Sequence, residues 1–146
     1  KVYAALNPCF VVKVPCTDQG IAASRLLERE GIRTNVTLVF SASQALPPAK
    51  NGALFVSPFV GWKEESGEDT GQFVSDIVTI YRNYGFKTQV LAASIRSPIH
   101  VLDAAKAGAH VATMPFSVLE MLMKHPLTDI GLKKFLEDWE KSGSKI

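Results

Sequence analysis

Short apolar runs rich in β-branched residues alternate with helical patterns along the whole chain. Five of these runs read as strands, at residues 10–15, 34–40, 53–59, 88–93 and 110–114. They contain few polar interruptions, which is typical of parallel strands that are covered on both faces. Because a segment of helical periodicity follows each run, the pattern predicts an α/β protein built from five repeated βα units.

The helical segments carry start and stop signals. Asp18 is expected to cap a helix that ends at Gly31. The longest helix is predicted at about 70–84, because apolar residues recur there at helical spacing and Gly85 follows.

A last amphipathic helix is predicted at about 129–140. Its apolar side carries four large residues, Leu132, Phe135, Leu136 and Trp139. A helix of this kind is expected to dock on an apolar surface.

Length and composition favour one globular domain, since the 146 residues are 47% hydrophobic. The net charge is +2, and 16 basic and 14 acidic side chains are mixed along the sequence, so no basic stripe indicates nucleic-acid binding. No apolar stretch reaches the roughly 20 residues of a membrane span, and no signal peptide opens the chain. We therefore expect a cytoplasmic protein without nucleic-acid or membrane partners.

Metal binding is not expected from the cysteines and histidines. Cys9 and Cys16 match no zinc-ligand spacing, and His100, His110 and His125 are scattered, so we interpret these histidines as structural.

The chain opens with Lys1-Val2-Tyr3-Ala4-Ala5-Leu6, without an initiator methionine. This opening already has the character of the end of a helix. We therefore expect the sequence to be a piece of a longer protein.

A single lysine, Lys13, lies in the apolar run 10–15, where no other residue is charged. An ammonium group among β-branched residues loses hydration, and that loss favours the neutral, nucleophilic amine that Schiff-base chemistry requires. Two plainer explanations stay open: the side chain extends to water from a strand end, or it pairs with a carboxylate elsewhere. Lys13 is thus a candidate nucleophile on this segment alone.

Polar side chains gather where the predicted strands end. Asn35 and Thr37 lie two residues apart and therefore on one face of the second strand, Ser57 is near the end of the third, and Ser94 and Arg96 follow the fourth. The carboxyl ends of parallel strands meet at one edge, so these side chains are expected to converge. The guanidinium of Arg96 and the hydroxyl of Ser94 match phosphate oxygens. Two alternatives stay open: Arg96 is an ordinary surface arginine, and Asn35 and Thr37 bind backbone groups of a turn.

Six segments stand together in an order known from one family: Val11-Val12-Lys13-Val14-Pro15, Gly31-Ile32-Arg33-Thr34-Asn35-Val36-Thr37-Leu38-Val39-Phe40-Ser41, Val56-Ser57-Pro58-Phe59-Val60-Gly61, Asn83-Tyr84-Gly85, Ala92-Ala93-Ser94-Ile95-Arg96 and Thr113-Met114-Pro115-Phe116. Over essentially the whole chain they resemble the small transaldolases, the family that includes fructose-6-phosphate aldolase.

The resemblance implies a (β/α)8 barrel of the class I aldolase type. Residues 1–146 would be a single domain, an incomplete TIM barrel with strands four to eight and a C-terminal helix. The resemblance assigns Lys13 as the Schiff-base former, Asn35 as a hydrogen-bonding partner of the dihydroxyacetone portion of the substrate, and Thr37 as a holder of the catalytic water. It implies neither a metal nor an organic cofactor, because the protonated imine accepts the electrons of the cleaved bond.

The same resemblance places Ser57 and Phe59 in the pocket and gives Ser94 and Arg96 the phosphate of the sugar-phosphate substrate. In this family a hydroxyl-bearing aromatic at the Phe59 position accompanies free aldolase activity, and phenylalanine accompanies transfer. The implied function is therefore a transaldolase of the pentose phosphate pathway. Its substrates would be fructose 6-phosphate, sedoheptulose 7-phosphate, erythrose 4-phosphate and glyceraldehyde 3-phosphate.

The chain departs from the family pattern in two places. The first three barrel strands, with the acid/base glutamate of the third, have no counterpart, and Trp62 stands where the family has an arginine. Loss of that charge-assisted bond is expected to cost about 1.5–3 kcal/mol of phosphate binding unless Arg96 or Lys63 compensates. Two alternatives follow: an aldolase without transfer, or a non-catalytic module that binds sugar phosphates through Ser94 and Arg96.

The resemblance also implies a homo-oligomer for the complete protein. Small transaldolases form rings in which the C-terminal helix packs on a neighbour. Packing of the 129–140 helix on its own barrel is equally compatible with the sequence.

Overall fold

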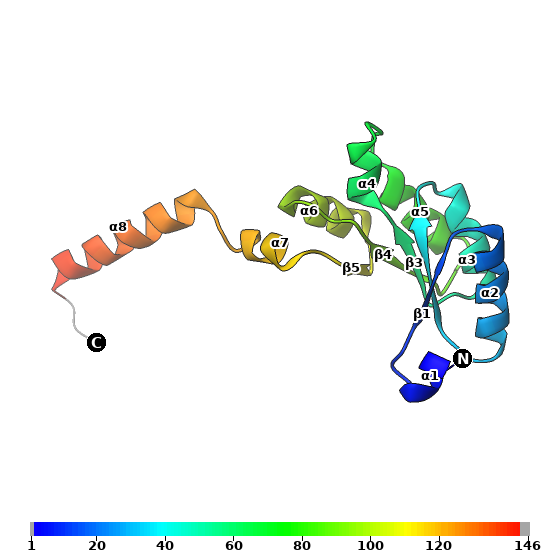
Figure 1. Ribbon diagram of the computed structural model, residues 1–146. Coiled ribbons are helices and arrows are strands. Elements are labelled where there is room, and N and C mark those ends of the chain that lie inside the picture. The colour runs from blue at the N-terminus through cyan, green and yellow to red at the C-terminus, as the bar shows by residue number, and fades with distance from the viewer. Residues whose placement is uncertain (1, 144–146) are drawn as a thin grey trace.

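The computed structural model describes residues 2–143. Its five strands are β1 (Val12–Pro15), β2 (Thr34–Val39), β3 (Phe55–Pro58), β4 (Gln89–Ala92) and β5 (Val111–Ala112). They form one sheet in the order β1-β2-β3-β4-β5, and every neighbouring pair is parallel (Figure 1). A sheet that grows in chain order without a reversal is built as a (β/α)8 barrel is, and differs from a doubly wound sheet. The α/β class and the partial-barrel arrangement are confirmed.

One helix precedes β1, and the others follow the strands. They are α1 (Val2–Leu6), α2 (Asp18–Arg29), the 3-10 turn η1 (Ser43–Ala45), α3 (Leu46–Asn51), α4 (Val60–Glu65), α5 (Phe73–Asn83), α6 (Pro98–Ala107), α7 (Phe116–Met121) and α8 (Pro126–Ser142).

The start of α2 differs from the prediction. Thr17, in an extended conformation, is the N-cap, and its Oγ1 accepts the Gly20 N–H at 3.1 Å. Asp18 is the first helical residue, where a carboxylate favours the positive end of the helix dipole. Gly31 follows the helix with a φ of 75°, as a stop residue should.

Helix α5 was predicted to be the longest, and this is wrong: it has 11 residues, against 12 in α2 and 17 in α8. It also begins later than predicted, at Phe73. Asp69 Oδ1 accepts the Gly71 N–H at 2.8 Å, and this local turn competes with helix over the residues before Phe73. Gly85, with a φ of 63°, follows the end of α5 as predicted.

The main core lies between one face of the sheet and helices α3 and α5. Val36, Val56 and Val90 point to this face and are fully buried, as is Ile77 of α5. Complete burial of such a side chain contributes about 1.5–3 kcal/mol. A hydrogen bond of 2.8 Å between Ser24 of α2 and Thr34 of β2 attaches α2 to the same face.

The other face of the sheet carries the residues that alternate with this core. The strand register pairs Lys13 with Asn35 and Pro15 with Thr37. Asn35 pairs with Phe55 on the next strand, and Ser57, two residues later, lies on the same face. In a closed barrel this face would point inward. Here Lys13 and Pro15 of the edge strand are exposed.

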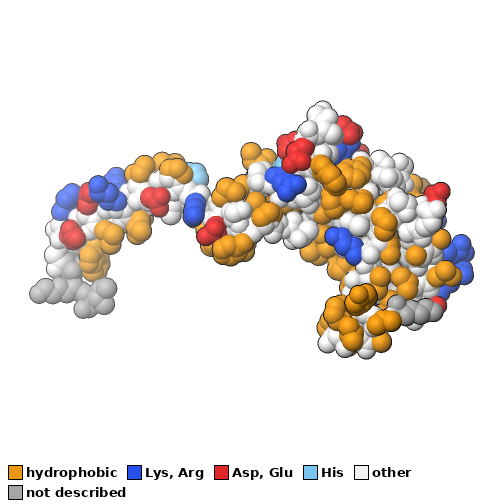
Figure 2. Space-filling view, viewed as in Figure 1, with side chains coloured by type: hydrophobic (Ala, Val, Ile, Leu, Met, Phe, Trp, Pro, Cys, Tyr) orange, Lys and Arg blue, Asp and Glu red, His pale blue; other side chains and the backbone are white. Residues whose placement is uncertain are grey.

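Helix α8 starts earlier and ends later than predicted, and it extends away from the sheet (Figure 1). None of its residues is buried against the described part of the chain, and Phe135 (72% exposed) and Trp139 (48%) are at the surface. Figure 2 shows both hydrophobic and charged side chains along this helix. The expected docking surface is therefore not supplied by residues 2–143. Over the same residues, no helix combines the length and the apolar character that crossing a membrane requires.

Candidate active site

Lys13 lies on β1 with its side chain on the sheet face that no core helix covers. It is exposed, while its neighbours Val12 and Val14 are half-buried. The expectation that Lys13 is desolvated in this chain is therefore wrong. The physical reason is its position on an edge strand, where the flanking valines pack on the opposite face and leave the ammonium in water.

Asn35 is the register partner of Lys13 on the neighbouring strand. Ser57, fully buried on β3, donates its hydroxyl hydrogen to Asn35 Oδ1 at 2.7 Å. With the carbonyl oxygen of the amide engaged, the Asn35 amide NH2 is the group available to donate to an oxygen near Lys13. Three residues from three consecutive strands are thus brought together on one face.

Thr37 continues this face, and its hydroxyl is in an unusual situation. Thr37 Oγ1 is buried and has no hydrogen-bond partner among the described residues. An unpaired buried hydroxyl costs about 1–3 kcal/mol, so a partner from outside residues 2–143 would stabilise Thr37 Oγ1. A water molecule or a substrate oxygen meets that need.

A bulge directly after Thr37 sets the direction of this part of β2. The register shifts between Val36 and Val39, and Leu38 has a φ of 61°. Because of the extra residue, Val36 and Val39 both reach the helix-covered core and are fully buried. A positive φ at leucine costs about 1–3 kcal/mol, and nothing in the sequence predicted it.

Phe59 lies directly after β3, as the N-cap residue of α4. Its ring centroid is 5.8 Å from that of Phe40 and 6.0 Å from that of Trp62, and Phe40 and Trp62 are 5.9 Å apart. Aromatic pairs at these separations attract one another. The three rings form an aromatic cluster at the end of the strands, with Trp62 51% exposed.

Lys63 does not replace the positive charge that Trp62 lacks. Its ammonium forms an ion pair with Glu68, whose pKa is lowered by that hydrogen bond and by the lysine charge. The ammonium is also 5.5 Å from the centroid of the Phe73 ring. These contacts direct Lys63 to the segment between α4 and α5.

Ser94 and Arg96 lie in the loop between β4 and α6. Ser94 has a φ of 58°, and its carbonyl accepts the Gly61 N–H at 3.0 Å. Arg96 Nε is 3.3 Å from Glu65 Oε1, with both side chains about half exposed. Both residues contact α4, the helix after β3, so the structure attaches the candidate phosphate clamp to this helix.

Two residues that the sequence reasoning did not place in the site hold this loop. A Cβ on Gly61 would lie 2.1 Å from the Ser94 carbonyl oxygen, so only glycine allows the close approach. His100, interpreted as structural, is 5% exposed and contacts both Glu64 and the Arg96 backbone. Its spacing, four residues after Arg96 at a helix start, is the signal that could have identified it.

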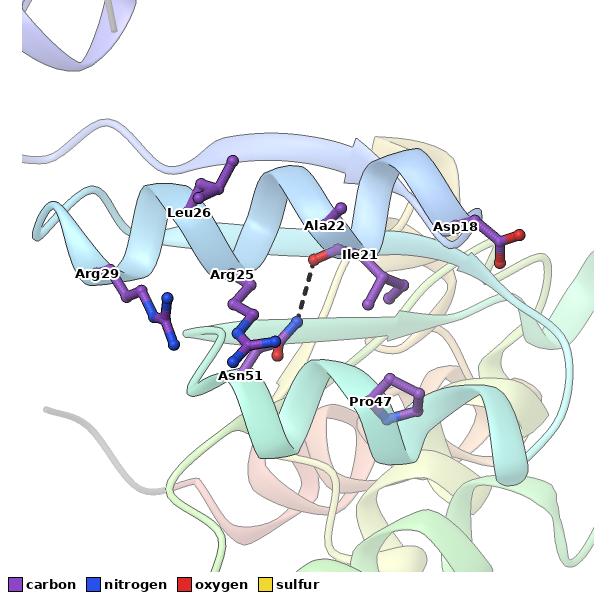
Figure 3. A pocket seen from close by; sticks show the side chains of 8 residues that line it. All are labelled: Asp18, Ile21, Ala22, Arg25, Leu26, Arg29, Pro47 and Asn51. Atoms are coloured by element: carbon purple, nitrogen blue, oxygen red, sulfur yellow. Dashed lines mark hydrogen bonds between the residues drawn. The ribbon is translucent and has the colours of Figure 1, made fainter.

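A hollow of about 620 Å³ lies elsewhere, between α2 and α3, and does not coincide with the Lys13 face (Figure 3). It is lined in part by Arg25, Arg29 and Pro47, and Asn51 donates to the Ile21 carbonyl at 3.1 Å beside it. No group of three or more His, Cys, Asp or Glu residues that could hold a metal ion occurs among residues 2–143.

Five parallel strands in sequential order, with helices between them, are part of a (β/α)8-type barrel. The family model described as transaldolase/fructose-6-phosphate aldolase matches residues 1–146. The chain belongs to this family.

Known relatives agree. The chain is 57% identical over 141 residues to a probable transaldolase of Anaeromyxobacter sp. (strain Fw109-5) and 60% identical over 139 residues to that of Anaeromyxobacter dehalogenans, covering 97% and 95% of this chain. It is 52% identical over 139 residues, 95% of this chain, to a 6-deoxy-6-sulfo-D-fructose transaldolase of Priestia megaterium. The chain spans 66%, 64% and 62% of the lengths of these relatives.

Proposed function

We propose that the full-length protein is a transaldolase that moves a dihydroxyacetone unit between sugar phosphates through a Schiff base on Lys13. The observation that carries the proposal is the pairing of Lys13 with Asn35, itself hydrogen-bonded to Ser57, on one face of the sheet. Residues 1–146 would be part of one barrel domain in a cytoplasmic homo-oligomer, and the pentose phosphate pathway is the proposed setting.

In the proposed mechanism the Lys13 amine attacks the ketone carbon of the donor sugar, and loss of water gives an imine. Cleavage of the adjacent carbon–carbon bond releases an aldose phosphate: its hydroxyl proton passes to a base, a role for the family's acid/base glutamate outside residues 1–146, and the electron pair moves into the protonated imine to leave a three-carbon enamine. The enamine carbon then attacks the acceptor aldehyde. Hydrolysis of the new imine returns the free lysine.

Asn35 and Thr37 are proposed to handle the oxygens of this sequence. The Asn35 amide would donate to a hydroxyl of the dihydroxyacetone unit, since its carbonyl oxygen is held by Ser57. The buried Thr37 hydroxyl, without a partner among the described residues, would hold the water that leaves and returns. An unpaired hydroxyl in this place supports the role because a bound water removes its desolvation cost.

Transfer is favoured over free aldol cleavage by Phe59. Its ring packs with Phe40 and Trp62 and offers no hydroxyl to hold a water beside the enamine. Without such a water, protonation of the carbanion is slowed and the enamine survives until an acceptor aldehyde binds. Ser94 and Arg96 are proposed to bind the phosphate of either sugar.

A sulfonated sugar is the second candidate substrate, and the observation that favours it is Trp62. A phosphate monoester carries about −1.5 to −2 charges at pH 7, and a sulfonate carries one. Trp62 stands in place of an arginine, and the Lys63 ammonium is paired with Glu68. Arg96 remains in the candidate clamp: its Nε is near Glu65, and its terminal amino groups are the donors for an anion. One guanidinium suffices for a monoanion, and relatives named 6-deoxy-6-sulfo-D-fructose transaldolase support this reading.

Borohydride reduction in the presence of fructose 6-phosphate tests the proposal in the full-length protein. A reduced dihydroxyacetone adduct on Lys13, identified by peptide mass spectrometry, is expected. Lys13→Met should abolish the adduct, and Lys50→Met, a lysine that lies over the Phe86 ring, should not. An adduct on another lysine, or none, would overturn the proposal.

Substrate choice is tested by comparing kcat/KM for fructose 6-phosphate and 6-deoxy-6-sulfofructose in the wild type and in Trp62→Arg. The added charge-assisted bond should raise the preference for phosphate about ten- to a hundredfold. Trp62→Phe, which keeps an aromatic ring, should leave the preference within about threefold of the wild type. A wild type that ignores the sulfonated sugar would rule out the second candidate.

A further inference from the structure

His100 lies where the candidate phosphate clamp meets α4. It is on the first turn of α6, where the Ser97 N-cap hydroxyl accepts the His100 N–H at 3.3 Å. Only 5% of His100 is exposed, and both ring nitrogens have partners. Nδ1 accepts the Arg96 N–H at 3.2 Å, and Nε2 is 2.7 Å from Glu64 Oε2.

These two contacts determine where the ring proton lies. A backbone N–H can only donate, so Nδ1 must carry a lone pair when it meets Arg96. The proton is therefore on Nε2, which donates it to the Glu64 carboxylate. The ring is held in one tautomer and joins the helix α4 to the backbone of the loop that carries Arg96.

The same loop is attached to α4 at three further points. The Val60 and Gly61 N–H groups donate to the Ala93 and Ser94 carbonyls, each at 3.0 Å. Arg96 Nε is 3.3 Å from Glu65 Oε1. A carboxylate at Nε leaves the terminal amino groups of the guanidinium as the donors for a tetrahedral anion. Two adjacent glutamates of α4 thus hold Arg96. Glu65 contacts its guanidinium directly, and Glu64 reaches its backbone N–H through His100.

We propose that His100 is a positioning residue for recognition of the anionic group of the substrate. It fixes the Arg96 backbone against α4 through the Nδ1 contact, so that the guanidinium is presented in one direction. The inference rests on the proposed function, because it assumes that Arg96 binds the phosphate or sulfonate. It assigns a role to a histidine that takes no part in the chemistry at Lys13.

The test compares an acceptor with and without the anionic group in the full-length protein. His100→Ala should raise the KM for glyceraldehyde 3-phosphate about three- to tenfold, as expected for the loss of one hydrogen bond. The kcat, and the KM for unphosphorylated glyceraldehyde, should stay within about twofold of the wild type. Equal effects on both acceptors, or no effect, would overturn the inference.

Conservative variants separate positioning from general packing. His100→Asn retains an acceptor near the Nδ1 position and should recover much of the affinity, whereas His100→Gln reaches toward Glu64 and should not. His110→Ala is the matched control, because His110 Nδ1 also accepts a backbone N–H, that of Val90 at 3.1 Å, at the opposite end of β4. His110→Ala should change the KM values for phosphorylated and unphosphorylated glyceraldehyde by the same factor.

Glu64→Ala keeps the inference testable if His100→Ala does not fold, because Glu64 is 60% exposed and its removal leaves the core intact. It should shift the KM for the phosphorylated acceptor in the same direction. The trapping assay distinguishes failure of this inference from failure of the proposed function. A wild type without a Lys13 adduct overturns the transaldolase proposal. A normal adduct, together with equal effects of His100→Ala on the KM of both acceptors, overturns only the role of His100.

Discussion

Ser57 donates its hydroxyl hydrogen to Asn35 Oδ1 at 2.7 Å, and Asn35 is the register partner of Lys13. The bond fixes which way the amide of Asn35 points, because an oxygen that accepts from Ser57 leaves the NH2 group to donate elsewhere. The orientation of a proposed substrate-binding amide therefore depends on a buried residue one strand farther from the lysine.

Ser57→Ala should lower kcat/KM for fructose 6-phosphate about tenfold. Without the hydrogen bond from Ser57, the Asn35 amide can rotate and present its oxygen, in place of its NH2 group, to the substrate hydroxyl. Steady-state kinetics at matched folded-protein concentration measures this. Ser24→Ala is the control: it removes a buried hydroxyl with a 2.8 Å bond to Thr34 on the opposite face of the sheet. It should lower the unfolding free energy by about 1–3 kcal/mol and leave kcat/KM unchanged.

Gly61→Ala should destabilise the protein by about 1–3 kcal/mol, since the new Cβ would lie 2.1 Å from the Ser94 carbonyl oxygen and 2.6 Å from Arg96 Cγ. Urea denaturation measures the change. Gly131→Ala makes the same substitution in α8 with nothing within 4 Å and should be neutral or stabilising. Equal effects of the two substitutions would show that the close approach of α4 to the Ser94 loop is not rigid.

Leu38→Gly should give a more stable protein than Leu38→Ala, by about 1 kcal/mol. Within a strand the usual order is the reverse, because glycine loses more conformational freedom on folding. The φ of 61° at Leu38 inverts it, since alanine pays for a left-handed conformation and glycine does not. Chemical denaturation measures the free energy of unfolding of the two variants. A more stable Leu38→Ala would contradict the positive φ at Leu38.

The buried phenol of Tyr81 should make the protein less stable at alkaline pH. Its hydroxyl donates to the Ala45 carbonyl at 2.6 Å, and burial, with a smaller contribution from Cys16, raises its pKa above the ordinary value of 10.0. The folded state therefore holds the phenol proton more tightly than the unfolded chain. The resulting stabilisation is complete below pH 10 and decreases as the pH rises above it.

Tyr81→Phe should lose about 1 kcal/mol at neutral pH and then fall less steeply above pH 10 than the wild type. Urea midpoints across the alkaline range measure the difference. Burial also raises the pKa of the Cys16 thiol, and that contribution is common to both proteins. Parallel curves for the two proteins would refute the assignment to Tyr81.

The sequence by itself determined the five strands, their parallel pairing and the shared face of Asn35 and Thr37. These features follow from local rules: β-branched runs form strands, and side chains two residues apart share a face. The resemblance to transaldolases rests on the same contiguous segments. For this reason the candidate site could be predicted in outline before any contact was known.

Only the tertiary structure decided how these residues are held. The 2.7 Å bond between Ser57 and Asn35, the bridge from Glu64 through His100 to Arg96 and the exposure of Lys13 all depend on neighbours distant in sequence. The positive φ of Leu38 likewise belongs to a register shift between β2 and β3, after which Val39 lies in the core beside the helices. Such properties depend on packing between elements, which no local pattern of residues specifies.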